Sequence, residues 1–174
     1  RTLYVAGMCA LCVLHCGTFP EPTGVKPREE KVPTSDSAPD GVVRRLYDLG
    51  KASLDRAEFQ EAIDFFTRAI EADGAEFSLF IARGTAYHRC GRQRDAMSDL
   101  DTAVRLAPDN SDAYYCRGRI RFNLRDVDGS IADFTSALDL NSKYTAAYVC
   151  RGVMRVRLGD RVGGIEDFSA AIRL

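Results

Sequence analysis

The chain has 174 residues and a formal net charge of −1, and 45% of its residues are hydrophobic while 28% are charged. This is the composition of an ordinary globular protein, with no excess of either charge to attract an oppositely charged polymer. A charge so near zero, without a continuous basic stripe, argues against nucleic acid as a partner.

The first segment, residues 1–16, contains an uncharged apolar run from residue 3 to residue 14 behind Arg1. The run is shorter than the roughly 20 residues that a membrane-spanning helix needs, but it fits the apolar core of a secretory signal. Cys16 resembles the lipidated cysteine of a bacterial lipoprotein signal, although His15 stands where that family has a small residue. Three interpretations stay open: a lipid anchor at Cys16, a hydrophobic signal without lipid, or a plain apolar N-terminus. We expect an exported protein, membrane-anchored, periplasmic or extracellular, with a cytoplasmic protein as the alternative.

Residues 17–42 are predicted to form a semi-stiff, disordered tether. This stretch is polar and holds all prolines but one, at Pro20, Pro22, Pro27, Pro33 and Pro39. Such a segment cannot bury enough apolar surface to offset its ordering entropy, and its prolines favour extended backbone.

From residue 43 onward the sequence repeats itself every 34 residues. The repeat is marked by a glycine, an aromatic residue or leucine, and an alanine: Gly50, Gly84, Gly118 and Gly152; Phe66, Leu100, Phe134 and Phe168; Ala69, Ala103, Ala137 and Ala171. This period predicts stacked two-helix units over 43–76, 77–110, 111–144 and 145–174. The small residues let two helices of a unit approach, and the aromatic residue fills the space opposite.

Together these columns resemble the tetratricopeptide repeat. The resemblance is carried by Phe80, Arg83, Gly84, Tyr87, Ala96, Leu100, Ala103 and Pro108 in the second unit, and by Tyr114, Arg117, Gly118, Ser130, Phe134 and Ala137 in the third. It implies an all-α, right-handed superhelical solenoid of stacked antiparallel helix pairs, with four units of which the last is incomplete. The sequence departs from the family where Ser53, Arg121 and Arg155 replace a tyrosine.

Arginine precedes the repeat glycine in three units, and aspartate follows sixteen residues later in the same three, giving the pairs Arg83 and Asp99, Arg117 and Asp133, and Arg151 and Asp167. The first unit lacks both and has Leu49 and Phe65. This joint occurrence predicts a structural ion pair between first and second helices, either within a unit or across adjacent units. Two independently solvated charges remain the alternative.

No motif for catalysis is present, and we expect neither an enzyme nor a cofactor. The chain lacks a phosphate-binding glycine loop and a nucleophile elbow, and its histidines are His15 and His88 alone. His88 and Cys90 lack further ligands nearby, so no metal site is expected. Cys116 and Cys150 occupy equivalent positions in adjacent units, too far apart for a disulfide, and are expected to pack as small apolar residues.

The resemblance also implies that the first helices line a concave groove that receives a partner. Among the positions that its register places there, twelve are candidate partner-binding residues: Tyr47, Lys51, Ile81, Thr85, His88, Arg89, Tyr115, Arg119, Phe122, Asn123, Val149 and Arg157. Aromatic and cationic residues at these positions would suit a peptide or protein partner with apolar and acidic residues. Plainly solvated arginines are the alternative.

Chaperone-binding members of the family hold a peptide's terminal carboxylate with Lys and Asn at set groove positions. The matching positions here carry Tyr47, Lys51, Ile81, Thr85, Tyr115 and Arg119, so a co-chaperone role is disfavoured.

The last helix is expected to expose apolar residues, namely Ile165, Phe168, Ala171 and Ile172. Terminal repeats need a polar outer face, so further chain or another subunit would cover this side, with self-association possible. The sequence therefore predicts a non-enzymatic interaction scaffold, membrane-tethered or exported. The alternatives are an accessory domain of a larger enzyme or regulator that continues beyond Leu174, and a self-assembly module.

Overall fold

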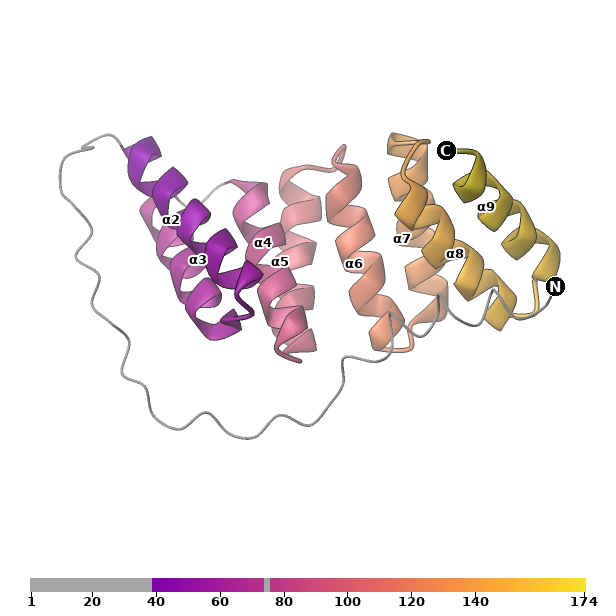
Figure 1. Cartoon of the computed structure of the whole chain (residues 1–174), viewed down its shortest axis with the longest axis horizontal. Helices are drawn as coiled ribbons and strands as arrows, with labels where there is room; N and C mark the ends of the chain where they lie inside the picture. Colours follow the sequence, from indigo (N-terminus) through magenta and orange to yellow (C-terminus); the bar gives the residue numbers. More distant parts are fainter. Residues whose placement is uncertain (1–38, 74–75) are drawn as a thin grey trace. The chain divides into compact units, whose positions relative to one another are not determined.

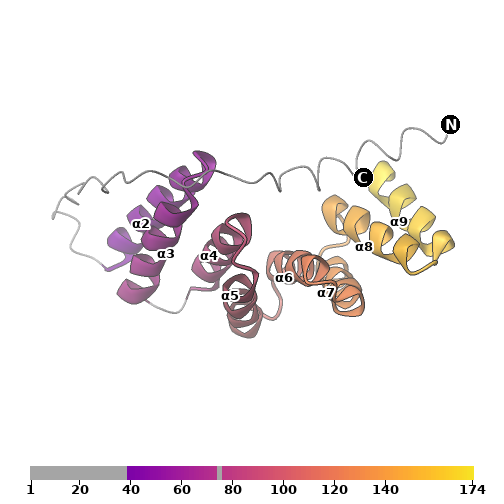
Figure 2. The ribbon, with the colours of Figure 1, turned by 90° about the horizontal axis from the view of Figure 1, so that it is seen from below.

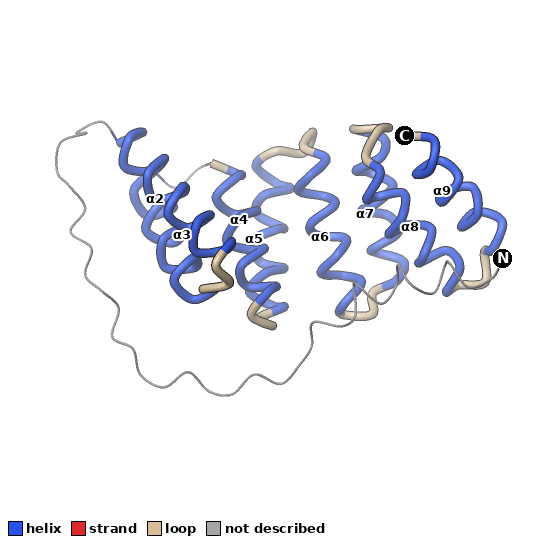
Figure 3. The backbone as a smooth tube through the Cα atoms, viewed as in Figure 1, coloured by secondary structure: helices blue, strands red, loops and turns tan. Residues whose placement is uncertain are grey.

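The computed structural model describes residues 39–73 and 76–174, which form helices and connecting turns without a strand (Figures 1 and 3). The helices are α2 (Pro39–Asp55), α3 (Phe59–Asp73), α4 (Phe77–Arg89), α5 (Gln93–Leu106), α6 (Ser111–Asn123), α7 (Val127–Leu140), α8 (Thr145–Arg157) and α9 (Arg161–Arg173). The predicted all-α class is confirmed. The predicted leader, Cys16 and residues 17–38 of the predicted tether lie outside the described residues. Within the described part, no helix has the length and apolar character needed to cross a bilayer.

The eight described helices pack as four consecutive hairpins. The partners are α2 with α3, α4 with α5, α6 with α7, and α8 with α9, and each second helix also contacts the first helix of the next pair. Figure 2 shows these pairs following one another in chain order. The first helices α2, α4 and α6 also touch in succession. Neighbour-to-neighbour packing of this kind is the arrangement of a helical repeat protein.

The recurring glycine faces the recurring aromatic ring inside each hairpin. A Cβ atom placed on Gly118 would lie 2.9 Å from Cε1 of Phe134, and one on Gly152 would lie 2.9 Å from Cε1 of Phe168. In the second hairpin the facing side chain is Leu100, whose Cγ would be 3.1 Å from a Cβ on Gly84. The helices of a pair therefore approach more closely than an alanine would allow without a shift of the ring.

The apolar core continues from one hairpin into the next. Leu79 of α4 is fully buried against Ala69 of α3 and Leu46 of α2, so three helices share one cluster. The same contact recurs where Leu138 of α7 packs against Ala147 of α8. Since each hairpin buries its second helix under its neighbour, the stack gains stability from every added unit.

The outer side of α9 has no such neighbour among the described residues. Ile165 is 63% exposed and Ile172 is 84% exposed, whereas their counterparts on α7, Ile131 and Leu138, are half-buried and buried. Two of the four residues predicted to be exposed on this helix therefore are, whereas Ala171 and Phe168, whose ring faces Gly152, are half-buried.

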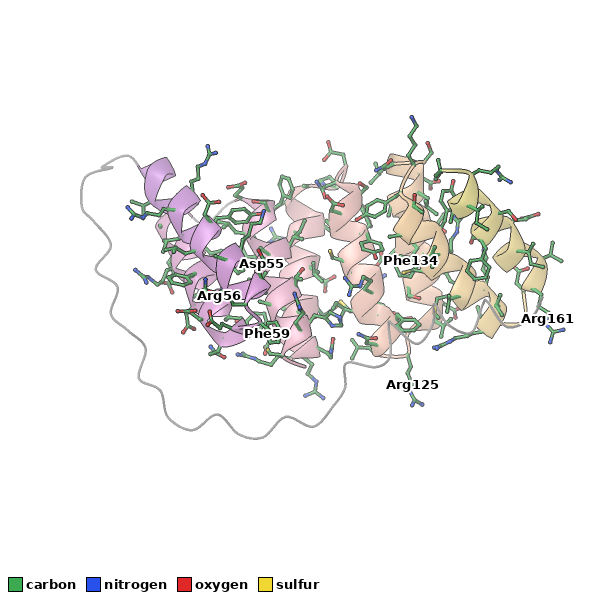
Figure 4. All side chains as sticks on the ribbon, viewed as in Figure 1. Asp55, Arg56, Phe59, Arg125, Phe134 and Arg161 are labelled. Carbon is green, nitrogen blue, oxygen red and sulfur yellow. The ribbon has the colours of Figure 1, made fainter. Side chains whose placement is uncertain are left out.

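Each turn from the first to the second helix of a hairpin contains one residue with positive φ. These residues stand 34 positions apart: Ala57 (φ 62°), Gly91 (φ 84°), Arg125 (φ 64°) and Gly159 (φ 89°). Glycine adopts this left-handed conformation freely, whereas a side chain makes it unfavourable. The Arg125 side chain projects away from the helices in Figure 4. Two of the four turns thus carry backbone strain.

The first helix begins earlier than the sequence predicts. α2 starts at Pro39 rather than at Val43, so residues 39–42 of the predicted tether are helical. A proline is well suited to the first turn of a helix, because its missing N–H is not needed there and its φ is already helical. Pro39, predicted to belong to the tether, instead marks the start of the helix.

Candidate interaction surface on the first helices

Arg83 of α4 forms a bidentate ion pair with Asp99 of α5. Its Nε and Nη2 atoms donate to the two carboxylate oxygens of Asp99, both at 2.8 Å. The arginine side chain is 16% exposed and the aspartate side chain 8%, so the pair is largely shielded from water. The hydrogen bonds to Asp99 raise the pKa of Arg83, which therefore stays charged throughout the accessible pH range.

The equivalent pairs in the next two hairpins have the same geometry with an additional donor. Arg117 donates to Asp133 at 3.0 and 2.8 Å, and Arg151 donates to Asp167 at 3.0 and 2.7 Å. Arg121 and Arg155, which replace the family's tyrosine, also reach these two aspartates, at 3.0 and 3.1 Å. This second donor was not predicted, although arginine at both positions, twelve residues before an aspartate, was a visible signal.

These arginines also reach the preceding hairpin. The Nη1 atom of Arg83 donates to Thr67, that of Arg117 to Asp101, and that of Arg151 to Thr135, at 3.1 to 3.2 Å. All three predicted ion pairs therefore lie within a unit. A third bond of each arginine joins adjacent units, and for Arg117 alone this bond is also an ion pair. These residues hold hairpins together and are too buried to form an exposed binding site.

The twelve candidate groove residues lie on α2, α4, α6 and α8, and we call them the first-helix surface. Three of them also pack inward. Tyr47 lies 5.9 Å from the Phe66 ring, Tyr115 lies 5.9 Å from the Phe134 ring, and Ile81 joins the cluster around Leu100. The register thus includes residues that contribute to the core as well as to the surface.

Neighbouring first helices meet on this surface. The amide nitrogen of Asn123 on α6 lies 3.4 Å from Nδ1 and 3.5 Å from Nε2 of His88 on α4, and Oε1 of Gln93 lies 3.0 Å from the same Nδ1. Burial lowers the pKa of His88, and the positive charges of Arg119 and Arg89 lower it further. The imidazole is therefore neutral at pH 7, and it forms part of a continuous polar surface across two hairpins.

Four cations of the first-helix surface each lie over an aromatic ring. Lys51 lies 5.6 Å from the ring centre of Tyr47, and Arg119 lies 5.8 Å from that of Tyr115. Arg89 lies 5.0 Å from Phe59, and Arg157 lies 4.9 Å from Phe122. A cation over a ring face is held in place electrostatically while its N–H groups stay available.

The remaining positions are small or apolar. Val149 is half-buried on α8, and Thr85 donates its hydroxyl proton to the Ile81 carbonyl oxygen at 2.8 Å. Burial raises the pKa of the Cys116 thiol to about 11. The described cysteines include no bridge between Cys116 and Cys150, and no cluster of metal-ligating side chains occurs in residues 39–73 and 76–174.

The architecture and the surface define a class, namely an all-α repeat protein of the protein–protein interaction type. A family model described as "Tetratricopeptide repeat" matches residues 43–76 and 77–110. The first two units are thus tetratricopeptide repeats, and α6 to α9 continue the same hairpin packing. Interaction with another protein is thus the function that the fold supports.

Solved structures and curated proteins give the same result. The first tetratricopeptide domain of Spaghetti (RPAP3) bound to the HSP90 peptide SRMEEVD is 27% identical, with a TM-score of 0.66, and the match covers 68% of this chain and 94% of that one. MamA is 22% identical, with a TM-score of 0.70 over 75% of this chain and 77% of that chain, which is a likeness of fold alone. The "Heat-shock protein cognate (HSC) co-chaperone sgt12" of Aspergillus fumigatus is 30% identical over 86 residues, 49% of this chain and 25% of that protein. The chain spans a quarter or less of the first curated relatives that it matches.

Proposed function

We propose that this chain is a non-enzymatic scaffold that binds a peptide or protein partner on the first-helix surface. The observation that carries the proposal is the continuity of this surface, on which His88 of α4 and Asn123 of α6 meet at 3.4 Å. It offers ring faces for apolar side chains and guanidinium donors for acidic ones. The relative that binds an HSP90 peptide supports a peptide as the class of partner.

The chaperone tail itself is not the guest that we propose. The family's terminal-carboxylate clamp requires Lys and Asn at positions that here hold Ile81, Thr85 and Tyr115. Ile81 and Tyr115 are, moreover, packed against core residues and present little polar surface. We expect the SRMEEVD peptide to bind no better than its C-terminally amidated form.

We further propose that residues 1–16 export the chain or tether it to a membrane. The apolar run behind Arg1 and the position of Cys16 support this proposal. Labelling with a radioactive fatty acid tests the lipid anchor: label should enter the unaltered chain and be absent from Cys16→Ser. Label in neither protein would contradict lipidation, and export without label would favour a signal that carries no lipid.

The binding proposal is tested by recovery of partners on the full chain. In the test variant, Arg119→Glu and Phe122→Ala alter the first-helix surface and spare Tyr115, which packs against Phe134 and Tyr144. In the matched control, Arg94→Glu and Leu106→Ala make the same changes on exposed residues of α5. Partners should be retained by the control and lost by the test variant, with equal thermal unfolding midpoints.

Equal recovery on both variants would overturn the assignment of the surface. Light scattering on the same samples addresses the alternative of self-assembly. A concentration-dependent oligomer that both variants preserve, with no other partner recovered, would favour self-assembly instead.

A further inference from the structure

The arginines of α4, α6 and α8 fall into two groups. Five of the eight donate to aspartates of second helices, and these are Arg83, Arg117, Arg121, Arg151 and Arg155. The other three are Arg89, Arg119 and Arg157, which make no ion pair with any described residue and lie over rings instead. The second group therefore carries charge that the described side chains leave uncompensated.

The helices α4, α6 and α8 supply almost no acid that could serve as the counter-charge, whereas α2 contains Asp40, Asp48 and Asp55. Neither α4 nor α8 contains Asp or Glu, and α6 contains only Asp112. That carboxylate accepts a hydrogen bond of 2.7 Å from the Tyr144 hydroxyl and so forms a contact between adjacent hairpins. Lys51 on α2 likewise makes no ion pair among the described side chains. Charge complementarity thus points to an acidic partner.

The four cations of the first-helix surface are spaced regularly, with one on each first helix, although α2 also carries Arg44 and Arg45 without an ion pair among the described residues. Lys51 and Arg119 hold the ninth position of their 34-residue units, and Arg89 and Arg157 hold the thirteenth. Positions nine and thirteen lie on one helix face, about 6 Å apart along the axis. Successive cations therefore alternate between two parallel rows.

An extended peptide can place its side chains opposite these cations at one spacing along its sequence. Packed helices stand about 8–10 Å apart, and an extended chain rises about 3.3 Å per residue, so about three residues span one hairpin. Side chains three residues apart on an extended chain point to opposite sides, because successive side chains alternate. Because the cations alternate between two rows, successive acidic residues of the bound peptide must be separated by an odd number of positions.

We infer that the first-helix surface recognises an extended segment of a protein partner in which Asp or Glu recurs at every third residue. Lys51, Arg89, Arg119 and Arg157 each take one side-chain carboxylate, while their rings hold them in position. The contact needs no terminal carboxylate, so the segment can lie within a longer chain. This inference rests on the proposed function and adds the chemical class and register of the partner.

The test is selection of peptides from a random ten-residue display library on the immobilised full chain. Pairs of acidic residues separated by three positions should be enriched at least about threefold over the library. The triple variant Arg89→Gln, Arg119→Gln and Arg157→Gln should lose this enrichment. The matched control changes Arg68, Arg94 and Arg105 to Gln, three exposed arginines of α3 and α5, and should keep it.

A synthetic pair of peptides then measures the register directly. One amidated peptide has Glu at every third position, and its isomer has the same residues with the glutamates adjacent. Fluorescence anisotropy should give the spaced peptide an affinity at least about fivefold higher, and the difference should vanish on the triple variant.

The other outcomes each overturn the inference. Enrichment at a separation of four would indicate a helical guest, and equal enrichment on both triple variants would place the binding elsewhere. The library could also yield peptides that contain no excess of acidic residues and that the Arg119→Glu, Phe122→Ala variant fails to bind. This result would contradict the spaced acidic residues and would still support binding on the first-helix surface. If no peptide is selected and the test and control variants of the recovery experiment retain partners equally, both this inference and the proposed function are wrong.

Discussion

Arg117 donates to both carboxylate oxygens of Asp133, and its third nitrogen donates to Asp101 of the preceding hairpin at 3.1 Å. One guanidinium thereby joins the two helices of its own unit to the second helix of the unit before. Since Arg83 and Arg151 do the same, polar bonds recur along the stack beside the apolar contacts.

Removing one partner of such a pair should be strongly destabilising. Asp99→Ala leaves the guanidinium of Arg83 largely buried without its acceptor, and we expect a loss of about 3–5 kcal/mol in the free energy of unfolding. Asp133→Ala should cost at least as much, because it deprives both Arg117 and Arg121 of an acceptor. Urea unfolding followed by circular dichroism measures both.

The first unit supplies the control for this prediction. It carries Leu49 and Phe65 at the positions of the arginine and the aspartate, so Arg83→Leu with Asp99→Phe copies a combination that the fold already accommodates. We expect the double variant to lie within about 1.5 kcal/mol of the unaltered chain, because a well-packed apolar replacement avoids the cost of burying charge. A double variant as unstable as Asp99→Ala would show that the ion pair contributes net stability.

The stability lost when alanine replaces a repeat glycine should depend on the side chain that faces that glycine. In Gly118→Ala the new methyl group meets the Phe134 ring at 2.9 Å and Asp133 Cβ at 3.2 Å, and we expect a loss of about 1–3 kcal/mol. In Gly84→Ala the nearest atom is Cγ of Leu100 at 3.1 Å, in a side chain that can turn, so the loss should be smaller. Equal losses at both sites would mean that the helices separate instead of the side chains moving.

The turn residues with positive φ offer substitutions that should stabilise the fold. Ala57→Gly and Arg125→Gly should each raise the free energy of unfolding by about 0.5–1 kcal/mol, because glycine adopts the left-handed conformation without a clash. Gly91→Ala, at the equivalent position with φ 84°, should lower it by a similar amount. Thermal unfolding midpoints rank the three variants, and a lower midpoint for Arg125→Gly would indicate that its side chain contributes contacts.

The period of 34 and its small and aromatic residues are sufficient to predict the hairpins, because close helix packing constrains residue size directly. The positive-φ column was not predicted, since alanine and arginine at positions 57 and 125 obscure the turn that Gly91 and Gly159 mark. The second donors Arg121 and Arg155 were missed for a different reason. Their spacing of twelve residues before Asp133 and Asp167 is visible in the sequence, but each aspartate already had a predicted partner in Arg117 or Arg151.

Acid should destabilise the chain through His88. Its pKa is lowered in the folded state from about 6.5, so the unfolded chain takes up a proton at a higher pH than the folded chain does. The stability that neutral His88 provides is complete above pH 6.5 and is lost as the pH falls through the lowered pKa of the folded state. His88→Gln should remove this component, so its stability should fall less than that of the unaltered chain between pH 7.5 and pH 5. Parallel curves for both proteins would contradict the assignment.

Burial should also protect Cys116 from alkylation. A thiol with a pKa of about 11 is ionised in only about one molecule in a thousand at pH 8, and the thiolate is the nucleophile. Cys90 is exposed at the end of α4, where water and reagent reach it. In native protein treated with iodoacetamide at pH 8, peptide mass spectrometry should find Cys90 modified at least about tenfold faster than Cys116. In urea the two rates should converge, because unfolding removes the burial that raises the pKa of Cys116. Comparable rates in the native protein would mean that α6 opens locally faster than the reagent reacts, and hydrogen exchange at α6 would then be correspondingly fast.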